Sequence, residues 1–229
     1  MAKITKIKGL NGGYPEPIIG TNEWFSCSES KDAFCDLYEA EEIIKLGKEY
    51  SGMVQHLIHY PEGTVYKPFT LQKNIYVEAP IFNNGKLYFL MVDFTEKIIK
   101  MQEYNPLNHE LNLYGSMSLL EIKDCYNLKL KAAPLILGRD ENDGFYEIVW
   151  PEKRKIAIGE TETVCFRDED KLYCSEWKEE SAYFENIIVR EYATGNIIEK
   201  KRGSIVQLAD GICWMISDEN ELNTNLIKR

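Results

Sequence analysis

Long hydrophobic runs are missing from this 229-residue sequence, and its basic residues are outnumbered. The apolar run from Tyr88 to Val92 is typical in length, whereas a membrane-spanning helix needs about 20 apolar residues. The first ten residues show no apolar stretch of a secretory signal, so we expect a cytoplasmic protein. Lysine and arginine total 27 against 37 aspartate and glutamate, a net charge of −10 at pH 7. Because no basic stripe is present, we expect neither nucleic acid nor a membrane surface as a partner.

Sequence motifs for nucleotide binding, serine hydrolysis and structural zinc are also absent. The chain has no G-x-G-x-x-G, no P-loop, no G-x-S-x-G and no C-x-x-C. Its six cysteines include Cys27 and Cys35, eight apart, and Cys165 and Cys174, nine apart. Without a secretion signal we expect them to be free thiols in a reducing compartment. The acidic stretches 140–143 and 168–170 are typical of solvated turns, so we expect no metal and no cofactor.

Short runs rich in Tyr, Phe, Ile, Val and Trp alternate with turn residues along most of the chain, as in antiparallel hairpins. The clearest predicted strands cover residues 86–94, 145–150, 171–177, 186–192 and 204–217. The predicted turns are Asn83-Asn84-Gly85, Asp143-Gly144, Thr194-Gly195-Asn196 and Asp210-Gly211. Helical periodicity is weak, and its best candidates are 38–50 and 116–124. The first of these also fits a turn followed by a strand.

Internal similarity gives these strands an order. Five segments share an apolar strand, a polar turn and an aromatic strand: 16–28, 78–92, 132–150, 162–177 and 203–217. A further strand often follows each pair. Units of three or four antiparallel strands bury their faces when they are arranged radially. We therefore expect an all-β fold, a single five-bladed β-propeller domain over residues 1–229, with the ring closed by the N-terminal strand. A β-sandwich is the alternative.

Two glutamates occupy comparable positions at the starts of the first two repeats. Glu16 directly precedes Pro17, and Glu78 stands two residues before Pro80. In a propeller the first strand of each blade lines the central channel, so the two carboxylates would face one another there. Carboxylates held close together titrate at separated pKa values, so that one donates a proton while the other activates water. Glycoside hydrolysis uses such a pair. Solvated rim residues are the alternative interpretation.

The segment EAPIFNNGKLYFLMV (78–92) resembles a motif of the five-bladed propeller glycosidases of the arabinanase, β-xylosidase and β-fructosidase type. The segment YPEPIIGTNEWFSCS (14–28) is similar to the first blade of that group. The resemblance implies that Glu78 is the general acid and Glu16 the general base. Where Glu16 stands, the group typically has an aspartate, and its third carboxylate has no counterpart in this chain.

Aromatic residues are abundant, with 14 Tyr, 9 Phe and 4 Trp, and most are expected to pack between strands. Tyr14, Tyr66 and Tyr76 flank repeat starts or the insertion 48–75, which makes them candidates for stacking on sugar rings. His56 and His59 are three positions apart. On a strand this spacing places them on opposite faces, so we do not expect a shared metal.

Three functional hypotheses follow. The first is a carbohydrate-directed propeller, hydrolytic if Glu16 and Glu78 form a base and acid pair, with an oligosaccharide or other small molecule as ligand. The second is a non-catalytic propeller that binds a sugar or a protein partner. The third is an assembly protein that uses the insertions 48–75 and 105–130 as an interface. Propellers serve all three roles.

Overall fold

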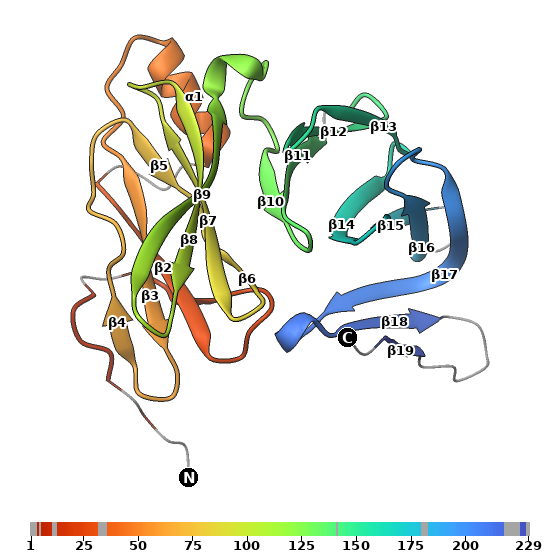
Figure 1. Cartoon of the computed structure of the whole chain (residues 1–229), viewed down its shortest axis with the longest axis horizontal. Helices are drawn as coiled ribbons and strands as arrows, with labels where there is room; N and C mark the ends of the chain where they lie inside the picture. Colours follow the sequence, from red (N-terminus) through yellow and green to blue (C-terminus); the bar gives the residue numbers. More distant parts are fainter. Residues whose placement is uncertain are drawn as a thin grey trace. The chain divides into compact units, whose positions relative to one another are not determined.

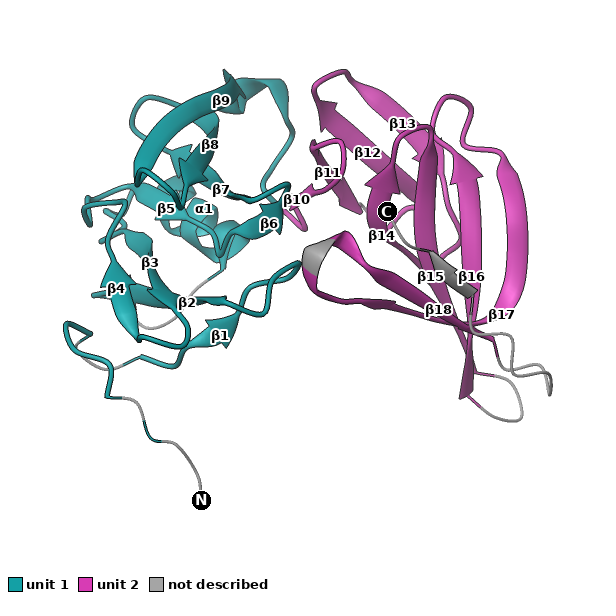
Figure 2. Ribbon diagram, turned by 60° about the horizontal axis from the view of Figure 1, so that its bottom comes forward, with its two compact units in different colours: residues 1–125 teal, residues 126–229 magenta. Residues whose placement is uncertain are grey.

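The computed structural model describes residues 4, 6–10, 13–31, 36–140, 142–179, 183–217 and 225–227, the last three and residue 210 by their backbone alone. The chain is mostly β, as the sequence predicts (Figure 1). It forms two compact units, Met1–Cys125 and Tyr126–Arg229 (Figure 2). A single domain over residues 1–229 stays a prediction.

Unit 1 is built on a nine-stranded sheet. Its strands are β1 (Glu16–Pro17), β2 (Trp24–Ser30), β3 (Met53–His59), β4 (Thr64–Tyr66), β5 (Ile75–Val77), β6 (Ile81–Asn83), β7 (Lys86–Asp93), β8 (Ile98–Asn105) and β9 (Glu110–Ser118). The main order is β1-β2-β3-β5-β7-β8-β9, with β4 on β3 and β6 on β7. All pairs are antiparallel except β3 with β5, which are joined at Met53 and Tyr76. The sheet therefore consists of two antiparallel parts, β1–β4 and β5–β9.

The hairpin between β6 and β7 forms where the sequence predicts it. Asn83 pairs with Lys86, which leaves Asn84 and Gly85 as a two-residue loop. Both have positive φ, 50° and 75°. That is the geometry of a type I′ turn, and Asn-Gly is its preferred sequence. The same turn therefore fixes the register of the strand that follows, β7.

The helix α1 (Leu37–Lys45) is shorter than the predicted 38–50. Asp36 caps its first turn and forms a capping box with Glu39. Gly47, with φ 71°, ends it in the left-handed conformation. The second predicted helix, 116–124, is instead the end of β9 followed by the 3-10 helix η1 (Leu119–Glu121). Among the described residues, no helix has the length and apolar character needed to cross a membrane.

The core of unit 1 lies between the two parts of its sheet. Trp24 and Leu57 from the β2–β3 side pack against Val77, Leu87 and Phe89 from the β5–β7 side. Leu57, Val77, Leu87 and Phe89 are 0% exposed. The continuous apolar run in β7 is explained by this packing, because the strand is buried on both faces.

Unit 2 contains two antiparallel sheets. The four-stranded sheet is β10 (Lys129–Lys131), β11 (Ile136–Asp140), β12 (Phe145–Trp150) and β13 (Arg154–Ala157), in chain order. The six-stranded sheet is β14 (Glu162–Asp168), β15 (Lys171–Glu179), β16 (Tyr183–Glu191), β17 (Ile197–Gln207), β18 (Cys213–Ser217) and β19 (Asn225–Ile227), also in chain order. The 3-10 helix η2 (Ala209–Gly211) stands at the predicted Asp210-Gly211 turn.

Both sheets of unit 2 contribute to a common core. Ile136 and Ile148 of the first sheet pack with Leu172, Cys174 and Ile188 of the second. A smaller cluster forms on the other face of β15 and β16, where Tyr173, Ile187 and Val189 meet Met215 of β18. The second sheet is thus covered on both faces over β15 and β16.

Strand pairing inside each unit is mainly that of up-and-down meanders, and the predicted strands 86–94, 145–150, 171–177 and 186–192 lie on β7, β12, β15 and β16. Segment 204–217 is divided between β17 and β18. The mostly β class is therefore established. The five-bladed arrangement and the alternative β-sandwich stay predictions.

Candidate functional site

The two predicted catalytic glutamates lie in unit 1 on different parts of its sheet. Glu16 is exposed in β1, where it pairs with Ser26 of β2. Glu78 directly follows β5 and is half-buried, and its backbone N–H donates to the Leu90 carbonyl. In the sheet order β2 and β3 stand between β1 and β5. Strands β1 and β5 are therefore three positions apart in the sheet order. An acid–base pair of Glu16 and Glu78 stays a prediction.

The segments that follow the two glutamates do meet. The backbone N–H of Phe82 donates to the carbonyl of Ile19 at 3.0 Å. Gly20 lies so close that an added Cβ would come 2.5 Å from the Phe82 carbonyl oxygen, and its φ is +94°. The loop after β1 is therefore held against strand β6, a few residues beyond Glu16 and Glu78.

The three predicted sugar-stacking tyrosines have different surroundings. Tyr14 precedes β1 and is 83% exposed. Tyr76 is only 4% exposed in β5, beside Met53 of β3, so its ring does not face solvent. Tyr66 in β4 is half-buried and belongs to a group of five rings. Of the three, only Tyr66 lies in a cluster of side chains that could form a site.

We call this group the aromatic–histidine cluster: Trp24, His59, Tyr66, Tyr104 and His109. His59 lies over Trp24, with ring centroids 4.7 Å apart, and Tyr66 lies 5.6 Å from Trp24. His109 stacks on Tyr66 at 4.5 Å. The rings come from β2, β3, β4, β8 and the turn after β8. Because Trp24 and Tyr104 also belong to the core, the cluster is anchored in the packed interior of unit 1.

The hydrogen bond between Tyr104 and His109 fixes the outer part of the cluster. The Tyr104 hydroxyl lies 2.9 Å from His109 Nδ1. Burial, with a further contribution from Tyr66, raises the pKa of Tyr104 to about 12. The hydroxyl is therefore protonated at neutral pH and able to donate to the imidazole. His109 has φ 60°, and its side chain is at the surface.

Exposed groups surround the cluster at the two turns that carry its histidines. In the β3–β4 turn, Tyr60 is 56% exposed, and Glu62 Oε2 lies 2.9 Å from His59 Nδ1. In the β8–β9 turn, Leu107 is 92% exposed, and the Asn108 amide donates to Glu110. Aromatic faces beside carboxylate and amide groups suit a ligand with both apolar faces and hydroxyls.

The opposite face of the β2–β3 pair carries a second polar group. His56 and His59 do lie on opposite faces, as their spacing predicts: His59 pairs with Trp24, and His56 pairs with Cys27. His56 Nε2 lies 2.5 Å from Glu29 Oε2. This hydrogen bond is the main cause that lowers the pKa of Glu29. Burial, followed by the charges of Glu16 and Glu29, raises the pKa of the Cys27 thiol.

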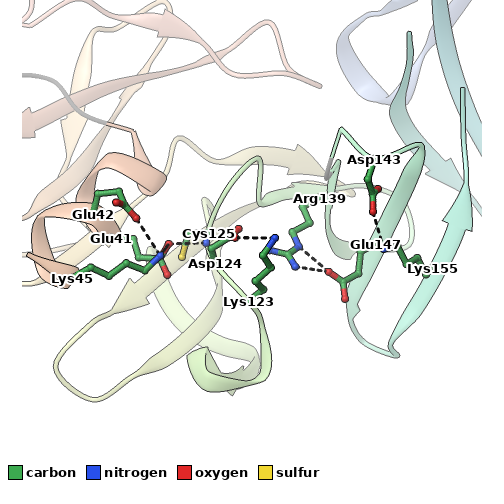
Figure 3. A network of polar contacts seen from close by, with 10 residues as sticks. All are labelled: Glu41, Glu42, Lys45, Lys123, Asp124, Cys125, Arg139, Asp143, Glu147 and Lys155. Carbon is green, nitrogen blue, oxygen red and sulfur yellow. Dashed lines mark hydrogen bonds and ion pairs between the residues drawn. The ribbon is translucent and has the colours of Figure 1, made fainter. Parts of the chain in front are cut away.

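The remaining charged groups mainly stabilise the fold. In unit 1, Lys45 lies 3.1 Å from Glu41 and 3.2 Å from Glu42, and Glu41 accepts from the Cys125 backbone N–H (Figure 3). In unit 2, Figure 3 shows the buried Arg139 guanidinium against Glu147, at 2.7 Å, and Lys155 against Asp143, at 3.0 Å. The side chains of the pair Lys155–Asp143 are about half exposed.

The described residues of the acidic turn 140–143 form internal hydrogen bonds. Asp140 accepts from the Asn142 backbone N–H, and Asp143 accepts from that of Phe145. In the part of the chain that the structure describes, no three His, Cys, Asp or Glu side chains gather so that they could hold a metal ion. Five cysteines are free thiols: Cys27, Cys125, Cys165, Cys174 and Cys213. Cys35 lies outside the described residues.

Sequence patterns alone missed both groups of side chains in unit 1. The aromatic–histidine cluster joins residues 24, 59, 66, 104 and 109, which come together only through the packing of two sheet parts. The contact of His56 with Glu29 depends on the register of β2 and β3 across 27 residues. One sequence feature could have indicated them: all three histidines, at 56, 59 and 109, lie in the first half of the chain.

Comparison with known proteins does not place the chain in a family. No family model and no curated protein match it. Among solved structures, dipeptidyl peptidase 4 of Porphyromonas gingivalis is similar, with 15% identity and a TM-score of 0.41. The similarity covers 86% of this chain and 33% of that one. This chain therefore spans about a third of that protein's length, and the low TM-score assigns neither a fold nor an activity.

Proposed function

We propose that this chain is a non-catalytic carbohydrate-binding protein whose ligand lies on the aromatic–histidine cluster. The observation that supports this most is the Tyr66–His109 stack. His109 is exposed and follows Asn108, and Glu62 lies 2.9 Å from His59 of the same cluster. Sugars have apolar faces that stack on rings and hydroxyls that need donors and acceptors. The cluster offers both, and its buried members hold the outer rings in place.

The position of the glutamates favours binding over hydrolysis. Glu16 is exposed on an edge strand, and β2 and β3 separate that strand from β5, which Glu78 follows. A retaining pair needs carboxylates about 5 Å apart and an inverting pair about 6.5–9.5 Å. An acid–base pair of this kind is held close together inside a site, whereas Glu16 is exposed at the end of the sheet order. This geometry supports the non-catalytic alternative.

The up-and-down sheets are consistent with a propeller, and we propose the five-bladed form as the architecture around this site. Strands β6–β9, β10–β13 and β14–β17 are each meanders of four strands. Within unit 2, successive meanders share a core, as neighbouring blades do. We further propose a cytoplasmic location, in which the free thiols stay reduced.

Replacing Tyr60 or His109 with alanine is expected to weaken glycan binding about tenfold or more. A lost ring contact of about 1.4 kcal/mol corresponds to a factor of ten in the dissociation constant. The probes are arabinan-, xylan- and fructan-derived oligosaccharides, and the measurement is isothermal titration calorimetry on the full chain.

Leu107→Ala is the matched control for these two variants. It changes an aliphatic side chain that is 92% exposed in the same turn as His109, so it should leave the affinity unchanged. Equal affinities in Tyr60→Ala, His109→Ala and the original chain would remove the cluster as the binding site. Failure of all three probe classes to bind at millimolar concentration would remove carbohydrate binding itself.

Glycoside hydrolysis by Glu78 as acid and Glu16 as base is the second candidate. The contact between Ile19 and Phe82 favours it, because it holds together the segments that follow both glutamates. This mechanism predicts that Glu78→Gln and Glu16→Gln each abolish the release of nitrophenol from aryl arabinosides, xylosides or fructosides. The non-catalytic proposal predicts no turnover in the original chain, so measurable hydrolysis that depends on both residues would replace it.

A further inference from the structure

Cys27 and His56 form a neighbouring pair on the face of β2 and β3 that lies opposite the aromatic–histidine cluster. They are directly opposite one another in the antiparallel register. Directly opposite residues place their side chains on the same face, with Cβ atoms about 4.5–5.5 Å apart. Cys27 is 2% exposed and His56 is 4% exposed. A thiol and an imidazole are thus held side by side in the interior of unit 1.

The carboxylate of Glu29 determines which nitrogen of His56 is available. Its side chain is 51% exposed, and one of its oxygens faces the imidazole. An ionised carboxylate only accepts, which places the proton on Nε2, 2.5 Å away. In the neutral imidazole the lone pair is then on Nδ1. This arrangement, a histidine oriented by a carboxylate through its other nitrogen, is typical of metal-bound histidines.

The Nδ1 atom is buried and has no hydrogen-bond partner among the described residues. Buried polar atoms are nearly always satisfied, and an exception points to a water molecule, an ion or a functional role. The unpartnered Nδ1 of His56 is evidence for a ligand that does not depend on the Cys27 thiol, because the hydrogen bond to Glu29 orients the imidazole. Both observations point to a ligand on this face.

We propose that Cys27 Sγ and His56 Nδ1 together bind one copper(I) ion. Zinc needs three or four protein ligands, and the described residues offer no such group. Copper(I) is soft, prefers thiolate and also accepts imidazole, and is stable with two ligands. On binding, a Cu–S and a Cu–N bond form and the thiol proton leaves to solvent. No electron is transferred. The Glu29 side chain, 51% exposed, places a carboxylate against His56.

The test is an anaerobic titration of the reduced full-length chain with copper(I), in competition with bathocuproine disulfonate. We expect Cys27→Ser and His56→Gln each to weaken the tightest site at least 100-fold. Cys213→Ser is the matched control, because this buried thiol pairs with Gln207 and Ile227 and has no histidine opposite. It should leave the tightest site unchanged. X-ray absorption of the one-copper form should show one sulfur and one nitrogen.

Glu29→Gln keeps both metal ligands. It therefore distinguishes a weaker copper site from a variant that fails to fold. Removing a carboxylate that orients a metal-bound histidine typically weakens affinity 10–100-fold, and we expect that range here. Unchanged affinity in His56→Gln or Glu29→Gln, all-sulfur coordination, or no competition with bathocuproine would each overturn the proposal. Because glycan binding uses the other face, either proposal can fail alone.

Discussion

Replacing Glu162 with alanine is expected to lower the free energy of unfolding of unit 2 by about 3–5 kcal/mol. Glu162 in β14 is 1% exposed, and both its oxygens accept from the Arg190 guanidinium, at 2.6 and 2.7 Å. Arg190 also donates to the Gly195 carbonyl, and the Gly159 backbone N–H donates to Glu162. Removing one partner leaves a buried arginine charge without compensation. Urea denaturation followed by tryptophan fluorescence measures the free energy of unfolding, because Trp150, Trp177 and Trp214 are in unit 2.

Lys201→Met provides the comparison for this variant. Lys201 lies 3.0 Å from Glu199 in the same sheet, but Glu199 is half exposed. Exposed pairs contribute about 0–1 kcal/mol, so this change should cost less than about 1 kcal/mol. The double variant Glu162→Met with Arg190→Met should recover much of the loss, because apolar residues replace a buried pair at little cost. If Glu162→Ala were as mild as Lys201→Met, the buried pair would not be a main support of unit 2.

The same ion pair predicts how stability depends on pH. Burial raises the pKa of Glu162, but the hydrogen bonds from Arg190 and the Gly159 backbone outweigh it, so the folded-state pKa lies below 4.5. The unfolded chain therefore binds this proton first as the pH falls. The stabilisation is complete above pH 4.5 and is lost as the pH drops through the folded-state value. Glu162→Ala should lack this part of the acid sensitivity.

Phe89→Ala is expected to lower the free energy of unfolding of unit 1 by about 3–5 kcal/mol. Phe89 in β7 is 0% exposed and packs in the core between the two parts of the sheet. Its ring also lies edge-on to Phe69, with centroids 4.9 Å apart. The variant loses the burial of the ring and leaves a cavity that the rigid strands around it only partly fill. Hydrogen exchange of the β7 and β8 amides measures the change.

Leu113→Ala is the control for the core variant. Leu113 lies in the same part of the sheet, in β9, but is 59% exposed. Its removal should change hydrogen exchange in β7 by little, because hardly any buried contact is lost. The same experiment shows whether the units unfold separately. Faster exchange confined to unit 1 is expected if each unit has its own core, as the separate clusters indicate.

Local features of the fold could be read from the sequence, because their causes are local. Asn84-Gly85 dictates the turn after β6, and the alternation of residues places His56 and His59 on opposite faces. The helix was predicted too long because its end depends on Gly47, a single residue in the left-handed conformation. Strand type and turn position thus follow from neighbours in the chain.

The candidate site could not be read in the same way, because it depends on contacts distant in the sequence. Tyr66 was predicted as a stacking residue from its place beside a repeat, yet its stacking partner His109 is 43 residues away. Tyr76 was predicted for the same reason but is buried within the sheet. The sequence pattern identifies aromatic residues near repeat starts, whereas the contact of Tyr66 with the distant His109 places only one of them in the cluster.

The most direct test of carbohydrate binding at the aromatic–histidine cluster uses the three histidines as reporters. The side-chain nitrogen signals of the ¹⁵N-labelled chain are recorded by NMR while arabinan-, xylan- or fructan-derived oligosaccharide is added. His59 and His109 belong to the cluster, and His56 lies on the opposite face of the same strands. We expect one oligosaccharide class to shift the His59 and His109 signals to saturation and leave His56 unchanged. Unmoved signals for all three histidines at millimolar sugar, or a shift of His56 alone, would contradict the account.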